Sequence, residues 1–209
     1  MLEIKDLKKR FGAKQVLNGV DLKVPEHSVF GFVGQNGAGK TTTMKMILGL
    51  LASDEGEIYI NGERVTCGSN KTNKYVGYLP DVPEFYDYMT ATEYLDFCGS
   101  VTGMGIAQKK ERIKEMLILV GLEKEEKRIK GFSRGMKQRL GIAQALLNKP
   151  LLLICDEPTS ALDPVGRKEI LEVLSAAKQD TTVLFSTHIL SDIEKICDHI
   201  ALLHDGKIL

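Results

Sequence analysis

Residues 34–42 read Gly34-Gln35-Asn36-Gly37-Ala38-Gly39-Lys40-Thr41-Thr42. They match the pattern G-x-x-x-x-G-K-[ST], and they stand between an apolar run, Val29–Val33, and a segment with helical spacing of apolar residues, Lys40–Leu50. Glycines allow a tight turn whose N–H groups point inward, and the N-terminus of the following helix adds positive potential. The pattern therefore predicts a buried strand, a phosphate-binding loop and a helix in succession.

Each group of this loop has a predicted role in holding a polyphosphate. Lys40 is expected to reach the β- and γ-phosphates, and the Thr41 hydroxyl is expected to ligate Mg²⁺. The nucleotide contacts predicted in the loop are Gly34, Asn36, Gly37, Ala38, Gly39, Lys40, Thr41 and Thr42. The alternative is a glycine-rich turn without a ligand, which the strand and helix on either side disfavour.

A second apolar run, Leu151–Cys155, ends in the adjacent carboxylates Asp156 and Glu157. A strand this apolar is expected near the centre of a sheet, where its C-terminal end would lie beside the phosphate loop. Asp156 suits Mg²⁺, commonly through water, and Glu157 is then placed to polarise the water that attacks the γ-phosphate. A solvated turn that simply ends the strand is the alternative.

The remaining pattern predicts an α/β chain. Residues 2–33 form short alternating runs that indicate two or three strands, and the Asn61-Gly62 turn indicates a further strand pair. Ala91–Leu147 has helical periodicity throughout, and buried strands separated by a helix near Pro164–Lys178 follow it. Strands alternating with helices of this size predict a mostly parallel sheet.

Composition excludes several classes of protein. The 28 Lys and Arg residues balance 28 Asp and Glu residues, so no bulk positive charge favours nucleic acid, and none is expected as a partner. No apolar stretch is long enough to span a bilayer, and the charged N-terminus lacks the apolar region of a signal peptide, so a cytoplasmic location is expected. The four cysteines are widely spaced and are expected to be reduced thiols.

Two further segments point to one family. Phe132–Leu140 resembles the ABC signature, usually written LSGGQ, and Asp156–Pro164 followed by Phe185–His188 resembles the ABC D-loop and switch histidine. With the phosphate loop and the aromatic Phe11, the chain resembles an ABC-transporter nucleotide-binding subunit over essentially its whole length. It is most similar to ABC-2-type exporter ATPases.

The resemblance implies a P-loop NTPase fold, with a RecA-like and mostly parallel sheet, an N-terminal antiparallel β subdomain and an inserted helical subdomain that carries the signature. Residues 1–209 are then a single nucleotide-binding domain. Residues 1–85 and 148–209 form its ATP-binding core with the β subdomain, and residues 86–147 form its helical subdomain.

The resemblance also implies roles for residues outside the loop. Phe11 stacks on adenine, His188 senses the γ-phosphate, and Ser133, Gly135 and Asp163 contact the nucleotide across the interface with an opposite subunit. Glu157, His188 and Lys40 are the implied catalytic residues. The alternatives are a packed aromatic for Phe11, an ordinary helix cap for Ser133 and a structural histidine for His188.

Asp81 departs from the family pattern, in which a Gln follows the strand here predicted at Tyr75–Leu79. A triphosphate would repel a carboxylate unless that carboxylate contacts the metal. Asp81 is therefore expected either to ligate Mg²⁺, together with Thr41 and Asp156, or to turn away from the nucleotide.

The implied function is that of an ATPase that binds MgATP in a head-to-tail dimer and drives transport, in the export direction, through separate transmembrane permease subunits at the inner face of the cell membrane. The alternative is a soluble ABC ATPase that acts on a non-membrane partner. The aromatic and acidic segment Glu84–Thr90 is open to two interpretations, a contact with the membrane partner or local packing. Metal binding by Cys197, His199 and His204 is not expected, because their spacing fits no zinc pattern.

Overall fold

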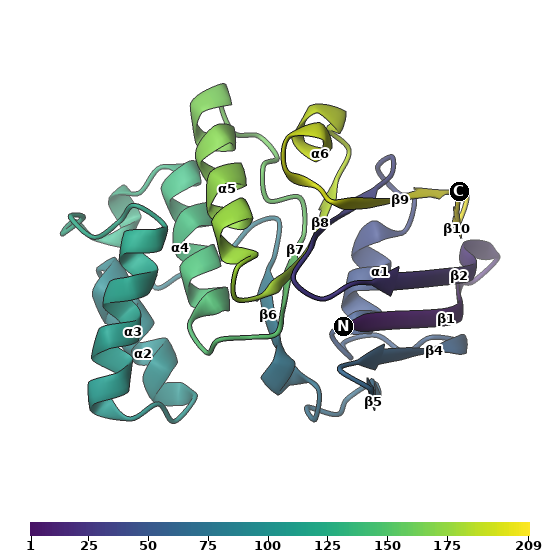
Figure 1. The fold of residues 1–209 in the computed structure, drawn as a ribbon, viewed down its shortest axis with the longest axis horizontal. Helices are drawn as coiled ribbons and strands as arrows, with labels where there is room; N and C mark the ends of the chain where they lie inside the picture. The colour runs from purple at the N-terminus through teal and green to yellow at the C-terminus, as the bar shows by residue number, and fades with distance from the viewer.

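The computed structural model describes residues 1–209, and Figure 1 shows helices gathered at one end and an antiparallel sheet at the other. Its helices are α1 (Lys40–Ile47), α2 (Ala91–Val101), α3 (Ile106–Leu119), α4 (Arg134–Leu146), α5 (Pro164–Ala177) and α6 (Leu190–Ile196). Its strands are β1 (Leu2–Phe11), β2 (Lys14–Val24), β3 (Val29–Val33), β4 (Glu55–Ile60), β5 (Glu63–Arg64), β6 (Val76–Leu79), β7 (Leu152–Cys155), β8 (Thr182–Thr187), β9 (His199–His204) and β10 (Lys207–Ile208). The 3₁₀ turns are η1 (Asn73–Tyr75) and η2 (Ile129–Gly131).

The central sheet has the strand order β10-β9-β3-β8-β7-β6. Its neighbouring strands are parallel except at the edge, where β10 pairs antiparallel with β9. This confirms the predicted mostly parallel sheet. The acidic strand β7 is paired on both sides, but β8 separates it from β3, so the two strands that carry phosphate-binding and acidic residues are not neighbours.

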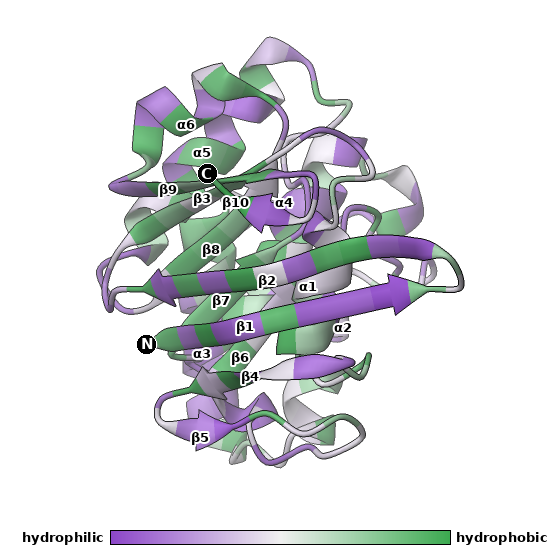
Figure 2. Cartoon of the chain, turned by 90° about the vertical axis from the view of Figure 1, so that its right-hand side faces the viewer, coloured by the Kyte–Doolittle hydropathy of each residue, from purple (hydrophilic) through white to green (hydrophobic).

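The second sheet is antiparallel, with the strand order β2-β1-β4-β5. Its first hairpin turns at Gly12-Ala13, so that Phe11 and Lys14 are paired at its tip. Figure 2 shows polar and apolar residues alternating along β1 and β2, whereas β7 and β8 are apolar. The difference follows from burial, because one face of the hairpin meets solvent and both faces of the central sheet are covered.

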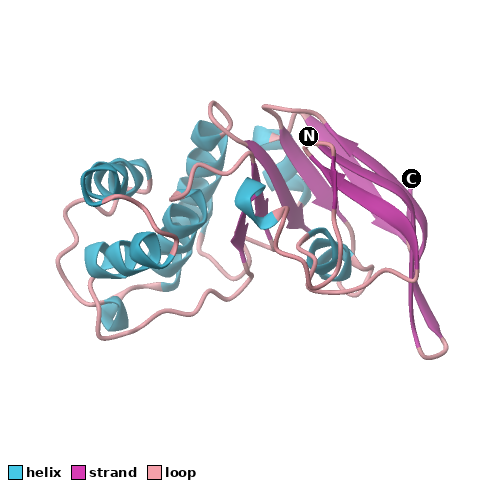
Figure 3. Cartoon of the chain, turned by 90° about the horizontal axis from the view of Figure 1, so that it is seen from below, coloured by secondary structure: helices cyan, strands magenta, loops and turns pink.

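Two hydrophobic clusters cover the two faces of the central sheet. Phe30 and Phe32 face the cluster of 19 buried residues that includes β1, β2, β4 and α1. Val29 and Val33 face the cluster of 28 buried residues that includes α2 to α6. Because side chains alternate across a strand, β3 contributes to both clusters. Figure 3 shows most of the helices at one end of the molecule and the strands, with further helices among them, at the other.

Helix α4 packs closely against strand β6 of the central sheet. A Cβ atom at Gly77 of β6 would come within 2.1 Å of the Ala145 carbonyl oxygen of α4, so only glycine allows this approach. Helices α2, α3 and α4 all fall within residues 86–147. No helix of the chain has both the length and the apolar character that a membrane span requires.

The predicted helix Lys40–Leu50 is wrong at its end. Helix α1 ends at Ile47, and Gly49 follows with a φ of 68° while its N–H donates to the Met46 carbonyl. A glycine with positive φ just beyond the last turn ends a helix. The predicted helix was too long because the apolar residues Leu50 and Leu51 extend the helical periodicity past Gly49, although Leu50 is exposed.

Candidate functional site

The phosphate loop has the backbone geometry that its glycines allow. Gly37 has a φ of 81° and Gly39 a φ of 112°, both in the region that L side chains rarely adopt. A Cβ atom at Gly39 would lie 2.9 Å from the Leu17 side chain. Helix α1 begins at Lys40, directly after this turn, so its N-terminus faces the loop. The predicted succession of strand, loop and helix is confirmed.

Lys40 is held at the centre of the loop. Its Nζ donates to the carbonyl oxygens of Gly34 at 2.7 Å and Gln35 at 3.3 Å, and it lies 3.1 Å from Oε1 of Glu157. The side chain is only 5% exposed, and burying a cation costs free energy that these three partners offset. Two carbonyls and a carboxylate therefore fix the ammonium group that the sequence predicts for phosphate binding.

The acidic pair at the end of β7 is also fixed, by Ser186 of β8. The Ser186 hydroxyl donates to Oδ1 of the buried Asp156 at 2.7 Å, and it accepts from the Glu157 N–H at 3.0 Å. Glu157 has a φ of 50°, a sparsely populated conformation for a residue with a side chain. Burial, with a contribution from the Asp156 carboxylate, raises the pKa of the neighbouring Tyr78 to about 12.

His188 follows β8 and contacts Glu157 from the side opposite Lys40. Its Nδ1 lies 2.7 Å from Oε2 of Glu157, while Lys40 lies against Oε1 of the same carboxylate. The histidine side chain is 44% exposed, whereas that of Glu157 is 14% exposed. Of the three residues predicted as catalytic, Glu157 therefore contacts both of the others, Lys40 at the start of α1 and His188 after β8.

A cavity of about 590 Å³ lies over the phosphate loop. It is lined by Phe11, Lys14, Val16, Asn36, Gly37, Gly39, Lys40, Thr41, Thr42, Asp81, Asp156 and Glu157. Phe11 is 49% exposed at its edge, which argues against the alternative of a packed aromatic. Lys14 and Val16 also line the cavity, and no sequence motif indicates them, because they reach it only through the fold of the hairpin whose tip pairs Phe11 with Lys14.

Asp81 lies on the wall of this cavity and is engaged with two other segments. Its Oδ1 accepts from the Ser160 hydroxyl and lies 3.7 Å from the Arg134 guanidinium, while its backbone carbonyl accepts from Gln138 at 2.6 Å. The carboxylate thus joins β6 to the loop after β7 and to α4. Its assignment as a Mg²⁺ ligand stays a prediction.

Six residues predicted to contact the nucleotide do not line the cavity: Gly34 and Ala38 of the phosphate loop, His188 after β8, and the three residues Ser133, Gly135 and Asp163. Ser133 is the N-cap of α4, its hydroxyl accepting from the Met136 N–H at 3.2 Å, and Gly135 lies in the first turn of that helix. Asp163 is the N-cap of α5, where its Oδ1 accepts from the Gly166 N–H at 3.0 Å. Within one chain Ser133 and Asp163 cap helices, and the contact of Ser133, Gly135 and Asp163 with nucleotide stays a prediction that requires a second subunit.

The three side chains predicted to ligate the metal offer oxygen donors only, which suits Mg²⁺. They are the Thr41 hydroxyl and the carboxylates of Asp156 and Asp81, which all line the cavity. No three His, Cys, Asp or Glu side chains gather closely enough to hold a metal by themselves. Mg²⁺ commonly takes one or two carboxylates together with substrate phosphates and water, so the donor set fits this ion better than it fits zinc.

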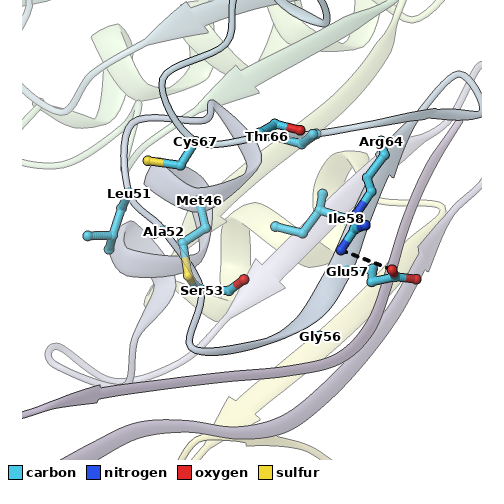
Figure 4. A pocket seen from close by; sticks show the side chains of 11 residues that line it. Met46, Leu51, Ala52, Ser53, Gly56, Glu57, Ile58, Arg64, Thr66 and Cys67 are labelled. Carbon is cyan, nitrogen blue, oxygen red and sulfur yellow. Dashed lines mark ion pairs between the residues drawn. The ribbon is translucent and has the colours of Figure 1, made fainter.

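A different cavity, of about 310 Å³, is lined by residues of α1, β4 and β5 and is drawn in Figure 4. Its charged side chains are Arg64 and Glu57, which already pair with each other at 3.0 Å. Leu51, Met46 and Ile58 form much of the remaining wall. It presents neither a glycine-rich loop nor an unpaired cation, so it does not suit a polyphosphate.

Comparisons with known proteins agree with this geometry. The family described as "ABC transporter" matches residues 17–160. The chain is 46% identical to the ABC transporter ATP-binding protein YxlF of Bacillus subtilis (strain 168), covering 100% of this chain and 69% of YxlF. It is 42% identical to the bacitracin transport ATP-binding protein BcrA of Bacillus licheniformis, covering 100% of this chain and 68% of BcrA.

Solved structures give the same result. One described as an ATP-binding subunit of an ABC transporter superposes with a TM-score of 0.85 at 36% identity, covering 100% of this chain and 88% of that one. The match spans both sheets and the helical segment, because it covers the whole chain. With the contacts among Lys40, Glu157 and His188 and the cavity over the phosphate loop, these similarities establish that the chain belongs to the ABC transporter family as an ATP-binding subunit and ATPase.

Proposed function

We propose that the chain is the motor of an exporter, in which MgATP closes a dimer of nucleotide-binding subunits and hydrolysis reopens it. The observation that carries this proposal is the single carboxylate of Glu157 held between Lys40 at 3.1 Å and His188 at 2.7 Å, at the wall of the phosphate-loop cavity. A base that contacts both a phosphate-binding cation and a hydrogen-bonding side chain suits phosphoryl transfer to water.

In this proposal, the chain's own residues act mainly by position and charge. Glu157 orients the attacking water and accepts its proton, Lys40 binds the β- and γ-phosphates, and His188 hydrogen-bonds the γ-phosphate. Phe11 stacks on adenine at the edge of the cavity. When bound through Thr41 and Asp156, with Asp81 as a candidate third ligand, Mg²⁺ neutralises part of the charge on the phosphate oxygens.

The second part of the proposal is a head-to-tail dimer. Ser133 is exposed at the N-terminus of α4, a helix of 13 residues, and its hydroxyl lies with the first N–H groups of that helix. Such a helix end favours an anion, here the γ-phosphate bound to the opposite subunit. Asp163, exposed at the start of α5, would face the same interface. Each ATP would then be enclosed by two chains.

The third part concerns the permease subunit, at the inner face of the membrane. We treat residues 86–147 as the helical subdomain and residues 1–85 and 148–209 as the ATP-binding core. A cavity of about 470 Å³ on the helical subdomain is lined by aromatic residues, including Tyr86 and Phe97, which are 48% and 41% exposed. Their rings lie 5.5 Å apart, edge to face. Exposed aromatic side chains around a groove favour a protein partner over solvent, which supports the partner interpretation of Glu84–Thr90.

The transported substrate is proposed only as a class. BcrA is described as a bacitracin transport ATP-binding protein, and similarity to it supports a bacitracin-like molecule as cargo. Export is the direction we propose, in accordance with the resemblance to exporter ATPases. A soluble ATPase with a non-membrane partner is the alternative outcome.

The experiment is purification of the tagged chain from detergent-solubilised membranes of the native cell. We expect one integral membrane subunit to copurify, and Phe97→Glu to abolish its recovery because the groove would carry a charge. Ile118→Glu is the control, since Ile118 is also exposed but lies outside the groove. Recovery of the chain only with ribosomes or DNA would contradict the transport function.

A further inference from the structure

A buried hydrogen bond joins the segment after β7 to the segment after β8. The Thr159 hydroxyl donates to Oδ2 of Asp192 at 2.7 Å, across 33 residues of sequence. Thr159 is 1% exposed and Asp192 is fully buried. Neither residue lines the phosphate-loop cavity, and neither has a predicted role, although Thr159 lies within the segment Asp156–Pro164. Any effect of the bond on catalysis is therefore exerted through other residues.

Burying a carboxylate costs free energy, which hydrogen bonds and paired charges can offset. Asp192 lies in the first turn of α6, where the helix dipole favours a negative charge, but its second oxygen, Oδ1, has no hydrogen-bond partner. Thr159 is consequently its one side-chain partner among the hydrogen bonds of the chain. The bond between Thr159 and Asp192 fixes the start of α6 against the loop after β7.

The segment after β7 is joined twice more, closer to the cavity, once to the segment after β8 and once to β8 itself. Glu157, two residues before Thr159, contacts His188, four residues before Asp192, at 2.7 Å. The Glu157 N–H also donates to Ser186 at 3.0 Å. Glu157 has a φ of 50°, and such a backbone persists only where surrounding contacts over-determine it. The Thr159–Asp192 bond is the one of these contacts that is fully enclosed in the core.

We propose that Thr159 and Asp192 are positioning residues, whose buried bond holds the turn bearing Glu157 in register with the turn bearing His188. Glu157 and His188 touch the reacting groups, and Thr159 and Asp192 act only through them. The inference rests on the proposed roles of Glu157 and His188. A loss of this bond leaves the nucleotide-binding loop in place and shifts the base, so it reduces turnover rather than affinity.

The chain offers a matched control for purely structural effects. Thr181 is a buried threonine like Thr159, with 3% of its surface exposed, and its hydroxyl donates to the Pro150 carbonyl at 2.8 Å. This bond also joins the segments that flank β7 and β8, but at the N-terminal ends of these strands, away from the cavity. Thr181→Val therefore removes an equivalent buried bond without touching the turns that carry Glu157 and His188.

The experiment compares Thr159→Val, Thr159→Ser and Thr181→Val in the purified full chain. The measurements are kcat and KM for ATP, the Kd of a non-hydrolysable ATP analogue and the melting temperature. For Thr159→Val we expect kcat to fall about 10- to 100-fold, with KM and Kd within about twofold. Thr159→Ser keeps the hydroxyl and should restore kcat, and Thr181→Val should lower the melting temperature but leave kcat unchanged.

Three results would overturn the proposal: an unchanged kcat in folded Thr159→Val, an equal fall in Thr181→Val, or a parallel loss of analogue binding. If Thr159→Val does not fold, the double variant Thr159→Val/Asp192→Leu removes both polar partners, and the same fall in kcat is required of it. Glu157→Gln separates the two hypotheses. If Glu157→Gln hydrolyses ATP normally, the proposed base is wrong, whereas a slow Glu157→Gln with a normal Thr159→Val rejects only the positioning role.

Discussion

The Nζ of Lys40 lies 3.1 Å from Oε1 of Glu157, so the cation predicted to bind phosphate contacts the carboxylate predicted to activate water. Lys40 is 5% and Glu157 14% exposed, and attraction between such charges is stronger than in bulk water. A γ-phosphate bound at Lys40 competes with Glu157 for the same ammonium group. Nucleotide binding is therefore expected to lengthen this pair and to free one carboxylate oxygen for a water molecule.

Lys40→Met should weaken ATP binding about 10- to 100-fold, because it removes a buried charge that hydrogen-bonds the phosphates. Isothermal titration with a non-hydrolysable ATP analogue measures the effect. Lys45→Met is the control, since Lys45 is an exposed lysine of the same helix. Equal affinity of Lys40→Met and the wild-type chain would contradict the role of Lys40.

Asp81→Gln should keep ATP hydrolysis within a few fold of wild type. The amide oxygen can still accept from Ser160, and the lost contact with Arg134 spans 3.7 Å between half-exposed groups, worth less than about 1 kcal/mol. Steady-state ATPase assays with and without added Mg²⁺ check this. Asp87→Asn removes a comparable exposed pair with α4, to Lys137, and serves as the control. Complete loss of activity in Asp81→Gln would give the acid a more specific role.

The four thiols should differ widely in reactivity. Cys67 is exposed, whereas burial raises the pKa of Cys197 to about 12 and also raises the pKa of Cys98 and Cys155. At pH 8, a thiol with a pKa of about 12 is ionised to about 1 part in 10⁴, and the thiolate is the reactive form. Intact-mass measurement during iodoacetamide treatment should show one fast adduct, which Cys67→Ser removes. Several fast adducts in the folded chain would contradict this prediction.

Asp198 should stabilise the fold above, but not below, its ordinary pKa. Its hydrogen bond from Lys178, at 2.6 Å, and that from the Val29 N–H, at 2.8 Å, lower its pKa from 3.8. A lowered pKa means that the stabilisation is present above 3.8 and is lost as the pH falls through the folded value. Both side chains of the ion pair are more than a third exposed, so the contribution of this pair is about 1 kcal/mol or less.

Thermal unfolding of Asp198→Asn and of the wild-type chain, at pH 7 and in acid, tests whether the stabilisation by Asp198 is lost on acidification. The melting temperatures should differ at pH 7 and converge in acid. Asp180→Asn is the control, because Asp180 is exposed and precedes the neighbouring strand β8. A difference that grows on acidification would show that the carboxylate is not stabilised in its ionised form.

Local pattern was sufficient to predict the elements that carry the site. Val29–Val33 is a strand and Lys40 begins a helix, as the glycine spacing between them predicts. The acidic pair follows a buried strand for the same reason, since the apolar run before Asp156 ends at the polar edge of the sheet. These features depend on residues that are near one another in the sequence, where turn and burial preferences act directly.

Contacts between distant segments could not be predicted in the same way. The predicted position of the acidic end of β7 beside the phosphate loop is confirmed by the contact between Glu157 and Lys40, but the strand order, with β8 between β3 and β7, depends on tertiary packing. The bond between Ser160 and Asp81 spans 79 residues, and that between Thr159 and Asp192 spans 33. Neither has a local signal. The position of Lys14 in the cavity wall was not predicted, because it depends on where the hairpin lies relative to the phosphate loop.

The most direct test of the catalytic account is a paired measurement on Glu157→Gln, namely single-turnover ATP hydrolysis and the Kd for ATP in the presence of Mg²⁺. The glutamine cannot accept the proton from water, and it no longer competes for Lys40. We expect hydrolysis to fall at least about 100-fold, while ATP binds as tightly as, or more tightly than, it binds to the wild-type chain. Near-normal hydrolysis by Glu157→Gln, or a loss of ATP binding in this variant, would contradict the account.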